Sequence, residues 1–274
     1  MSETVKRKVY LISDGTGITV ESLSNSLMSQ FGSIQFEKKT FPFVDTVPKI
    51  QAICDEIEQY YAVSALRPVV FMTLVNAEIS AHVKATCACV FDLFATFLAP
   101  LELELGIKAS DTVGLAHAAD NERYDQRIDA VNYALAYDDG IKLDGYEQAD
   151  IILVGVSRCG KTPSCLYMAL QFGLYAANYP FTLDELARHQ LPPILKPFHS
   201  KLFGLTIDPV RLQSIRTERR PNSAYASFEQ CRQEVREAEA LYLHEKIPYL
   251  DSTHFSIEEI ATRILAISKV QRKI

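Results

Sequence analysis

The chain has 274 residues, of which 48% are hydrophobic and 23% charged, and its formal net charge is −6. This length fits one large domain or two modest ones, and the composition is that of an ordinary globular protein. The acidic balance argues against a general nucleic-acid-binding protein. Its six cysteines lack the paired spacing of a zinc site, which favours reduced thiols.

The segment MSETVKRKVY has no apolar signal core, and no apolar run approaches the length that spans a bilayer. We therefore expect a cytoplasmic enzyme or regulator with no membrane partner. The sequence leaves the oligomeric state open, with a homo-oligomer as one alternative.

Residues 8–13 predict a first strand, which ends in the turn Asp14-Gly15-Thr16-Gly17. Apolar residues from Ile18 to Phe31 then recur at helical spacing. This turn could contact an anion or a hydroxyl group, or it could be a tight strand–helix turn with a capping Asp or Thr.

Alternating strands and helices continue through the first half of the sequence. Strands are predicted at 36–44 and 69–75, with helices at 46–60 and 77–86. Residues 89–105 predict a strand or short helix followed by a helix. This alternation is typical of a mostly parallel sheet.

Two adjacent carboxylates close the next helical pattern. A connecting loop at 106–121 leads to a helix at 124–137, which stops at Asp138-Asp139-Gly140. The two carboxylates could serve a metal or a substrate hydroxyl, or they could belong to a solvated turn.

The most informative stretch begins with a buried-strand pattern at 151–154. It continues into GVSRCGKT, which fits the phosphate-loop pattern G-x-x-x-x-G-K-[ST], and into a helix with Pro163 in its first turn. We predict that this loop binds a nucleotide or polyphosphate through the following residues: Gly155, Val156, Ser157, Arg158, Cys159, Gly160, Lys161 and Thr162.

The residue types in this loop suit phosphate chemistry. The two glycines permit close approaches that a Cβ would block, so that successive N–H groups can surround a phosphate at a helix N-terminus. Lys161 would reach the transferred phosphoryl group, and the Thr162 hydroxyl would bind Mg²⁺.

Further strands are predicted at 176–181, 201–208 and 247–251, with a small helix from Thr182 and no regular structure at 191–197. The strand that ends in Asp208 resembles the P-loop element whose Asp helps to hold Mg²⁺. The arginines that follow could neutralise phosphoryl charge or form a solvated basic face: Arg211, Arg216, Arg219 and Arg220.

The last two helices have different characters. The pattern at 227–244, rich in Glu and Arg, indicates a surface-exposed helix. The pattern at 256–267 indicates an amphipathic helix, and Ser256 with Glu259 forms a capping-box signature.

Six motifs in this order resemble one known family. They are SDGTG (13–17), AYDDG (136–140), GVSRCGKTP (155–163), AANYP (176–180), KLFGLTIDP (201–209) and STHFSIEEI (252–260). The chain resembles the bacterial regulatory proteins of phosphoenolpyruvate synthase and of pyruvate, phosphate dikinase. The resemblance covers about residues 8–267, essentially the whole chain.

The resemblance implies a bifunctional serine/threonine phosphotransferase. Its kinase reaction uses ADP to phosphorylate a threonine of the target enzyme, and its phosphorylase reaction uses inorganic phosphate and forms pyrophosphate. The wording of VSRCGKTP and AANYPF is closer to the synthase branch, so phosphoenolpyruvate synthase is the predicted partner. The alternatives are the same chemistry on pyruvate, phosphate dikinase, or a non-catalytic nucleotide-sensing module.

For this chemistry we assign charge stabilisation to Lys161 and Mg²⁺ binding to Thr162 and Asp208. The general base is predicted among Asp139, Asp138 and Asp14, in that order. The predicted fold is α/β, with an N-terminal α/β region (1–108), a connecting loop and helix (109–148) and a P-loop kinase-like region with a mostly parallel sheet (149–274).

Overall fold

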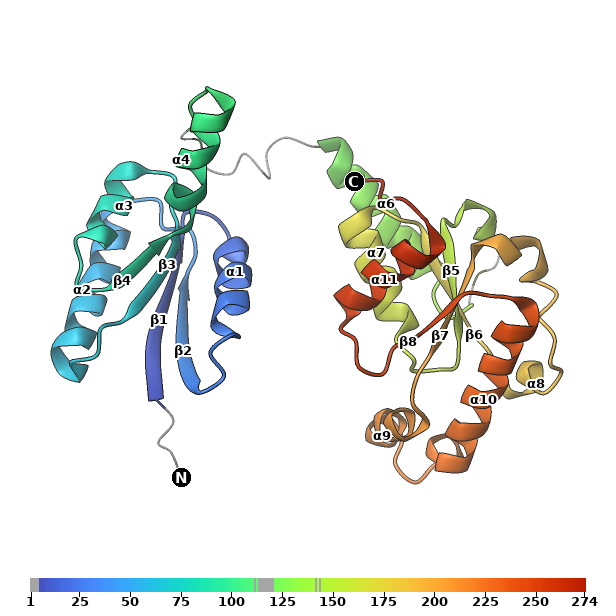
Figure 1. Ribbon diagram of the computed structural model, residues 1–274. Helices are drawn as coiled ribbons and strands as arrows, with labels where there is room; N and C mark the ends of the chain where they lie inside the picture. Colours follow the sequence, from blue (N-terminus) through green and yellow to red (C-terminus); the bar gives the residue numbers. More distant parts are fainter. Residues whose placement is uncertain (1–4, 111, 113–120, 141, 143) are drawn as a thin grey trace. The chain divides into compact units, whose positions relative to one another are not determined.

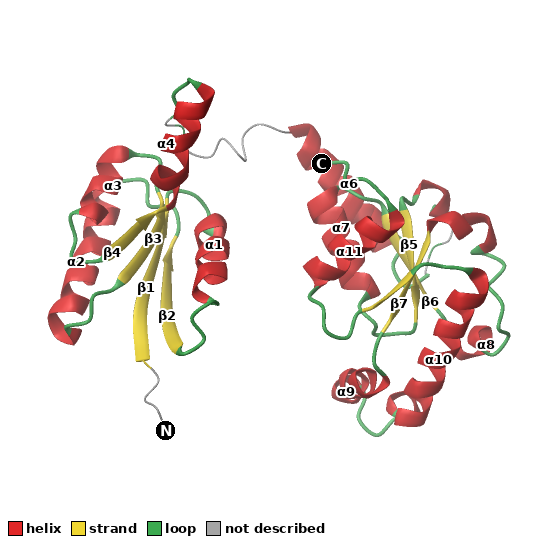
Figure 2. Cartoon of the chain, viewed as in Figure 1, coloured by secondary structure: helices red, strands yellow, loops and turns green. Residues whose placement is uncertain are grey.

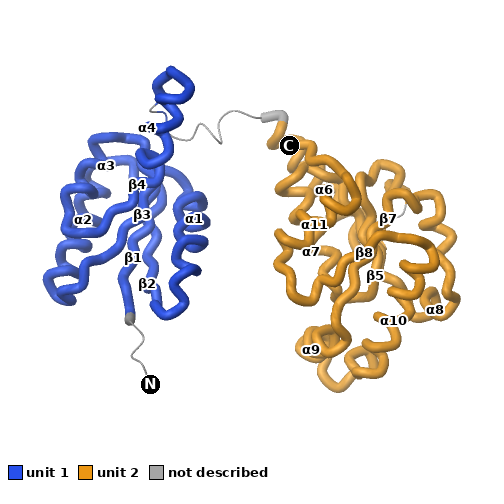
Figure 3. Tube along the Cα trace, in the orientation of Figure 1, with its two compact units in different colours: residues 1–119 blue, residues 120–274 orange. Residues whose placement is uncertain are grey.

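The computed structural model describes residues 5–110, 112, 121–140, 142 and 144–274. The chain divides into two compact units, residues 1–119 and 120–274 (Figure 3). Each contains a parallel four-stranded sheet, which confirms the predicted α/β class. The predicted boundaries at 108 and 149 stay a prediction, and residues 111 and 113–120 of the connecting segment lie outside the described residues.

Unit 1 is built on a parallel sheet with the strand order β2-β1-β3-β4 (Figure 1). Its strands are β1 (Val5–Ser13), β2 (Ile34–Phe41), β3 (Val69–Thr73) and β4 (Cys89–Asp92). The two central strands pair in register, with Val9 opposite Val69.

Helices cover both faces of this sheet because alternate residues of each strand point to opposite sides. The helices are α1 (Ile18–Met28), α2 (Val47–Ser64), α3 (Ala77–Lys84) and α4 (Leu93–Leu105). Val9 and Leu11 pack on the side of α1 and the start of α4, whereas Tyr10 and Ile12 pack on the side of α2 and α3 (Figure 2).

Unit 2 has the strand order β6-β5-β7-β8, again with parallel pairs only. Its strands are β5 (Ile151–Gly155), β6 (Ala176–Pro180), β7 (Leu202–Thr206) and β8 (Tyr249–Asp251). Every residue of β5 and β7 is buried, which explains why both strands are almost continuously apolar in sequence.

Helices also flank the sheet of unit 2. On one side lie α6 (Asn121–Ala136), α7 (Lys161–Phe172) and α11 (Ile257–Ser268) (Figures 1 and 2). The remaining helices are α8 (Leu183–Leu186), α9 (Pro209–Arg219) and α10 (Phe228–Glu245), with the short 3₁₀ helices η1 (Tyr146–Gln148), η2 (Lys196–Lys201) and η3 (Ala224–Ala226). Within the described part of the chain, no helix combines the length and apolar character needed to cross a membrane.

Two sequence predictions for unit 2 were wrong in detail. Helix α10 was expected on the surface, but its spacing of apolar residues buries one face, which includes Val235, Ala238 and Tyr242. The segment 191–197 was expected to lack regular structure, but η2 starts at Lys196 and accommodates Pro197 in its first turn. The Ser256–Glu259 capping box is confirmed.

Candidate functional site

The loop that joins β5 to α7 starts at Gly155, where only glycine can adopt the observed backbone conformation and contacts. Gly155 has φ 152°, and a Cβ there would lie 2.5 Å from the Leu205 carbonyl oxygen and 2.9 Å from Tyr242 Oη. Gly160, with φ 96°, is the N-cap of α7 and offers no side-chain cap. The first N–H groups of α7 therefore have no side-chain acceptor at the N-cap, as in an anion-binding helix start.

Two hydroxyl groups hold this loop against the ends of the neighbouring strands. Tyr242 Oη lies 3.0 Å from the Val154 carbonyl oxygen and 3.1 Å from that of Leu205. Ser252 Oγ lies 2.9 Å from the carbonyl oxygens of both Cys159 and Thr206. Tyr242 of α10 thus connects β5 to β7 just before the loop, and Ser252, directly after β8, connects the loop to the end of β7.

Lys161 is the electrostatic centre of the loop. Its side chain is buried, with 4% of the residue exposed, and Nζ donates to the carbonyl oxygens of Gly155 at 3.1 Å and Val156 at 2.8 Å. Among the described residues no carboxylate forms an ion pair with it. A buried ammonium bonded only to neutral carbonyls is an environment that an anion would complete.

A small cavity of about 190 Å³ opens beside this ammonium group. Its lining brings together predicted loop residues and one predicted carboxylate: Asp139, Ser157, Arg158, Gly160, Lys161, Thr162 and Pro163. Arg158 is exposed and has φ 76°, a left-handed conformation that is uncommon outside glycine. The exposed guanidinium and the buried ammonium make this cavity suitable for a small anion.

The adjacent carboxylates at the end of α6 reach the start of α7. Thr162 Oγ1 donates to Asp138 Oδ1 at 2.8 Å, and the Asn178 amide Nδ2 donates to the same oxygen. The Asp139 N–H donates to Asn178 Oδ1 at 3.1 Å, and Asp139 itself has φ 50°. Asn178 of β6 therefore holds the Asp138 carboxylate and the Asp139 backbone, a role that sequence analysis missed although its AANYP motif was noticed.

The cysteine inside the loop, Cys159, is expected to be unreactive. Burial raises the pKa of the Cys159 thiol, and the nearby Lys161 ammonium opposes this effect only in part. The thiol therefore stays protonated at neutral pH and is a poor nucleophile. Its contribution is to pack beneath the loop, where Cys159 is 1% exposed.

Arg216 differs from the other arginines of α9, which are exposed. It is fully buried, and its guanidinium forms a forked ion pair with Glu234 of α10, with Nη2 and Oε2 2.6 Å apart. Nη2 also donates to the Ser157 carbonyl oxygen at 3.1 Å, and the guanidinium stacks on Tyr225 at 4.1 Å. The interpretation of Arg216 as part of a solvated face was wrong, because α9 turns this residue inward with Leu212.

The contacts around Arg216 also involve residues that sequence analysis did not identify as important. Tyr225 Oη lies 2.9 Å from Ser157 Oγ, and Glu234 accepts from Arg216 across 18 sequence positions. The one available signal was the position of Arg216 four residues after the apolar Leu212, on the buried side of the helix.

Two other predicted residues have local partners. Asp208 caps α9, since its Oδ1 accepts from the N–H groups of Val210 and Arg211 at 2.9 Å. Within the described residues no hydrogen bond joins Asp208 to the loop. Asp14 lies in unit 1, where its Oδ2 accepts from the Val75 N–H at 2.7 Å. The roles predicted for Asp208 and Asp14 stay predictions.

Comparison with known proteins gives a consistent result over nearly the full length. A family model described as kinase/pyrophosphorylase matches residues 9–265. A Legionella pneumophila (strain Corby) protein is 58% identical over 271 residues, which cover 98% of this chain and 100% of that protein. A Hahella chejuensis protein is 50% identical with the same coverage. A Pseudomonas putida (strain W619) protein is 52% identical over 98% of this chain and 99% of its own. All three carry the name "Putative phosphoenolpyruvate synthase regulatory protein".

Proposed function

The chain belongs to the kinase/pyrophosphorylase family, and from this premise we propose that it is a bifunctional regulator of phosphoenolpyruvate synthase. It acts as an ADP-dependent kinase on a threonine of that enzyme and as a phosphate-dependent phosphorylase that reverses the modification. The family's description indicates phosphotransferase-type chemistry, and the names of the full-length relatives support the target.

The observation that carries this proposal is the buried Lys161 ammonium, which is bonded to two carbonyl oxygens and forms no ion pair among the described residues. Its ammonium lies beside a cavity that also receives Arg158 and the N-terminal end of α7. The terminal phosphate of ADP would bring the negative charge that this environment lacks. Preorganised donors of this kind stabilise the charge that develops in phosphoryl transfer.

In the kinase direction, the threonine oxygen of the target forms a bond with the β-phosphorus of ADP. The bond between that phosphorus and the bridging oxygen breaks, and AMP leaves with the electron pair. Asp139 lines the cavity and would accept the proton of the threonine hydroxyl. Lys161 and the loop N–H groups would stabilise the equatorial oxygens.

In the phosphorylase direction, an oxygen of inorganic phosphate attacks the phosphorus of the phosphothreonine. The new P–O–P bond forms pyrophosphate, and the threonine oxygen leaves and takes up a proton, for which Asp139 is the candidate donor. Both directions place a phosphoanhydride next to the same loop, so one site can serve both reactions.

The donor set near Thr162 fits Mg²⁺. This ion prefers hydroxyl, carboxylate, phosphate and water oxygens, and it usually uses only one or two carboxylates. Thr162 Oγ1 and Asp138 Oδ1 are 2.8 Å apart, so both oxygens already converge at the start of α7. We propose these two residues as the protein's part of the site, with Asp208 as the predicted alternative. When bound, the metal would neutralise charge on the phosphates.

Two alternatives remain to be separated from this proposal. The first is the same chemistry on pyruvate, phosphate dikinase. The second is a nucleotide-sensing module that binds ADP without transferring its phosphate. The acceptor enzyme and the transfer of label distinguish all three.

The decisive experiment incubates the purified chain and phosphoenolpyruvate synthase with β-³²P-labelled ADP and Mg²⁺. We expect label on a threonine of the synthase, release of AMP, and formation of pyrophosphate when phosphate is added afterwards. Lys161→Met should reduce the rate by about 10²–10³-fold, the usual cost of one transition-state donor. Lys196→Met, which changes an exposed lysine of the same unit, is the matched control.

Label that reaches only pyruvate, phosphate dikinase in a parallel reaction would favour the first alternative. Tight ADP binding by calorimetry without any transfer of label would identify a sensing module. Equal rates for the Lys161→Met and Lys196→Met variants would contradict the proposed role of the loop.

A further inference from the structure

Unit 1 contains a cavity of about 380 Å³ that the proposed function does not use. It lies at the carboxyl end of the sheet, where β1 has β2 on one side and β3 on the other. The helix that follows β1 covers one face and the helix that follows β2 covers the other, so the chain order reverses here. Such reversal points are where open α/β sheets bind ligands, and the volume lies in the usual range of about 300–1,000 Å³.

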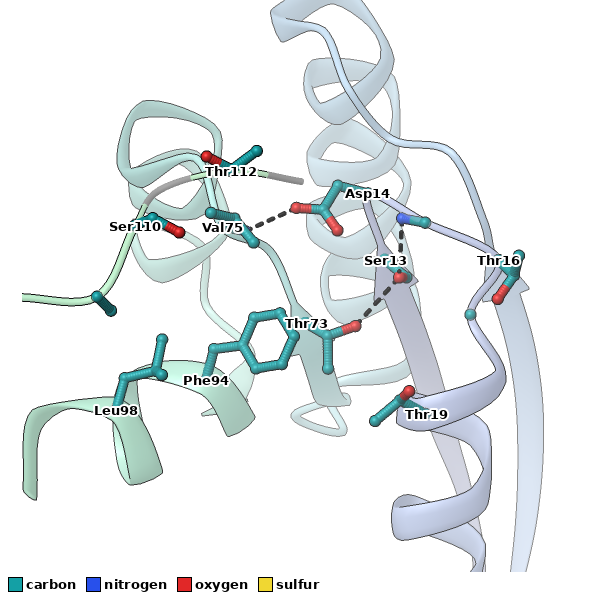
Figure 4. A pocket seen from close by; sticks show the side chains of 13 residues that line it. Ser13, Asp14, Thr16, Thr19, Thr73, Val75, Phe94, Leu98, Ser110 and Thr112 are labelled. Carbon is teal, nitrogen blue, oxygen red and sulfur yellow. Dashed lines mark hydrogen bonds between the residues drawn. The ribbon is translucent and has the colours of Figure 1, made fainter. Parts of the chain in front are cut away.

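Hydroxyl, carboxylate and apolar side chains line the cavity (Figure 4). Thr16 and Thr19 lie at the start of α1, and the Asp14 carboxylate lies beside Val75 on the side of β3. Phe94 and Leu98 of α4 form an apolar wall. The cavity therefore offers hydroxyl groups, a carboxylate and an aromatic surface in separate places.

The floor is a buried pair of hydroxyl groups. Ser13 is 5% and Thr73 3% exposed, and their Oγ and Oγ1 atoms are 3.1 Å apart. Ser13 Oγ also accepts from the Gly15 N–H at 3.1 Å. The pair carries two protons but forms one mutual bond, so one proton has no acceptor among the described residues. Ser13 Oγ already accepts from Thr73 Oγ1 and the Gly15 N–H and lines the cavity, so its own O–H can donate to an acceptor atom of a ligand.

The start of α1 supplies the positive side of the cavity. Gly17 is its N-cap, with φ 84° and no side-chain cap, so the N–H groups of the first turn face the DGTG turn without a side-chain acceptor. Exposed N–H groups and the helix dipole together favour a phosphate at this position. Thr16 and Thr19, which also line the cavity, each carry a hydroxyl group that can donate to an anion.

Asp14 makes the site selective for a ligand that also brings hydroxyl donors. Its Oδ2 accepts from the Val75 N–H at 2.7 Å, and its Oδ1 has no partner among the described residues. A carboxylate oxygen at the edge of an anion site repels a bare phosphate but accepts from a sugar hydroxyl.

We propose that this cavity is a second ligand site, specific for a nucleoside monophosphate. The phosphate binds at the start of α1, a ribose hydroxyl donates to Asp14, and the base packs against Phe94 and Leu98. The cavity is lined by residues of unit 1 alone, and binding there does not depend on phosphotransfer by unit 2.

The test measures AMP binding to the full-length Lys161→Met variant by calorimetry, so that the phosphate loop is impaired. We expect one AMP per chain. Adding Asp14→Asn should weaken binding at least tenfold, although the amide oxygen can still accept from the Val75 N–H. Thr73→Val, which removes one hydroxyl of the buried pair, should also weaken it. Asp45→Asn, which changes an exposed carboxylate of unit 1 outside the cavity, is the control.

Hydrogen exchange of the unmodified protein provides a second measurement that needs no variant. AMP should protect residues 13–19 as well as 155–162. Loss of all AMP binding in Lys161→Met, or no protection at 13–19, would overturn the proposal. So would unchanged affinity in Asp14→Asn and Thr73→Val, or binding of inorganic phosphate as tight as that of AMP. Failure of the phosphotransfer assay would leave each of these results unaffected.

Discussion

The two units use the same arrangement of strands for different local chemistry. In both sheets the first strand lies between the second and the third, and a glycine-containing turn leads from it into a helix. In unit 2 that turn spans residues 156–160 and leads into the buried Lys161, whereas in unit 1 it spans residues 14–17 and carries the Asp14 carboxylate. The topology thus sets where a ligand site can form, and the turn residues set which groups of a ligand that site can bind.

The largest expected effect is a loss of stability in unit 2 when the buried partner of Arg216, which bonds the Ser157 carbonyl of the turn, is removed. Glu234→Ala leaves the buried Arg216 guanidinium without its carboxylate, and breaking such a pair costs about 3–5 kcal/mol. Urea unfolding should show the loss in the transition of unit 2. The Lys8–Glu37 pair of unit 1 is the control, because Glu37→Gln changes an exposed residue and should leave the midpoint unchanged. Equal effects at both pairs would contradict this account.

Replacing the first glycine of GVSRCGKT or of DGTG should have different effects on the stability of the two units. In Gly155→Ala the new Cβ would meet the Leu205 carbonyl oxygen, and the φ of 152° is unfavourable for alanine. Strain and overpacking together should destabilise unit 2 by about 2–4 kcal/mol. Gly15→Ala places its Cβ 3.9 Å from Ser13 Oγ, an ordinary contact, and should be tolerated. Thermal unfolding of the two variants makes the comparison, and a stable Gly155→Ala protein would refute it.

Asn178→Ala tests how the carboxylates of unit 2 are positioned. The variant removes the amide that donates to Asp138 and accepts from the Asp139 N–H. Loss of such supporting groups commonly costs about 10–100-fold in activity or metal affinity. We expect kcat and the apparent affinity for Mg²⁺ to fall, with a smaller change in the KM for ADP. Asn25→Ala, in which an exposed asparagine bonded to Lys38 is changed, should have wild-type kinetics.

The smallest effect is a dependence of stability on alkaline pH. Burial, with smaller contributions from Asp55 and Glu58, raises the pKa of the Cys54 thiol in unit 1 to about 11 from its ordinary 9.0. Between these values the unfolded chain loses the proton and the folded unit keeps it, so stability falls as pH rises through this window. Cys54→Ala should make the decline shallower under reducing conditions, with no change in slope below pH 8. The slope that remains should include the thiols of Cys159 and Cys165, whose pKa values burial also raises.

The sequence predicted those features whose signals are local. The β-branched run of β5 and the fixed positions of GVSRCGKT are adjacent in the chain, and the capping box of α11 spans four residues. Hydrophobic periodicity also located most strands and helices, because burial on a sheet face repeats along the chain.

Long-range partners were not predictable in the same way. Asp138 and Asn178 are 40 positions apart, and no periodicity links them before β6 is placed beside β5. A solvated face was one of the two alternatives for Arg216, because a charged side chain is rarely fully buried. Its partner Glu234 lies on a helix whose many charges concealed its buried face. The hydrophobic pattern along one helix or strand indicates which of its faces is buried. The partner of a given side chain depends on how distant helices and strands pack together.

The contact between Arg216 and the Ser157 carbonyl has an entropic consequence. A loop of glycine and small residues would ordinarily lose conformational freedom when it closes around a diphosphate. Here one guanidinium connects the loop to α10 and η3, so much of that freedom is already lost when unit 2 folds. The binding free energy of a nucleotide would then be available for affinity rather than for ordering the backbone.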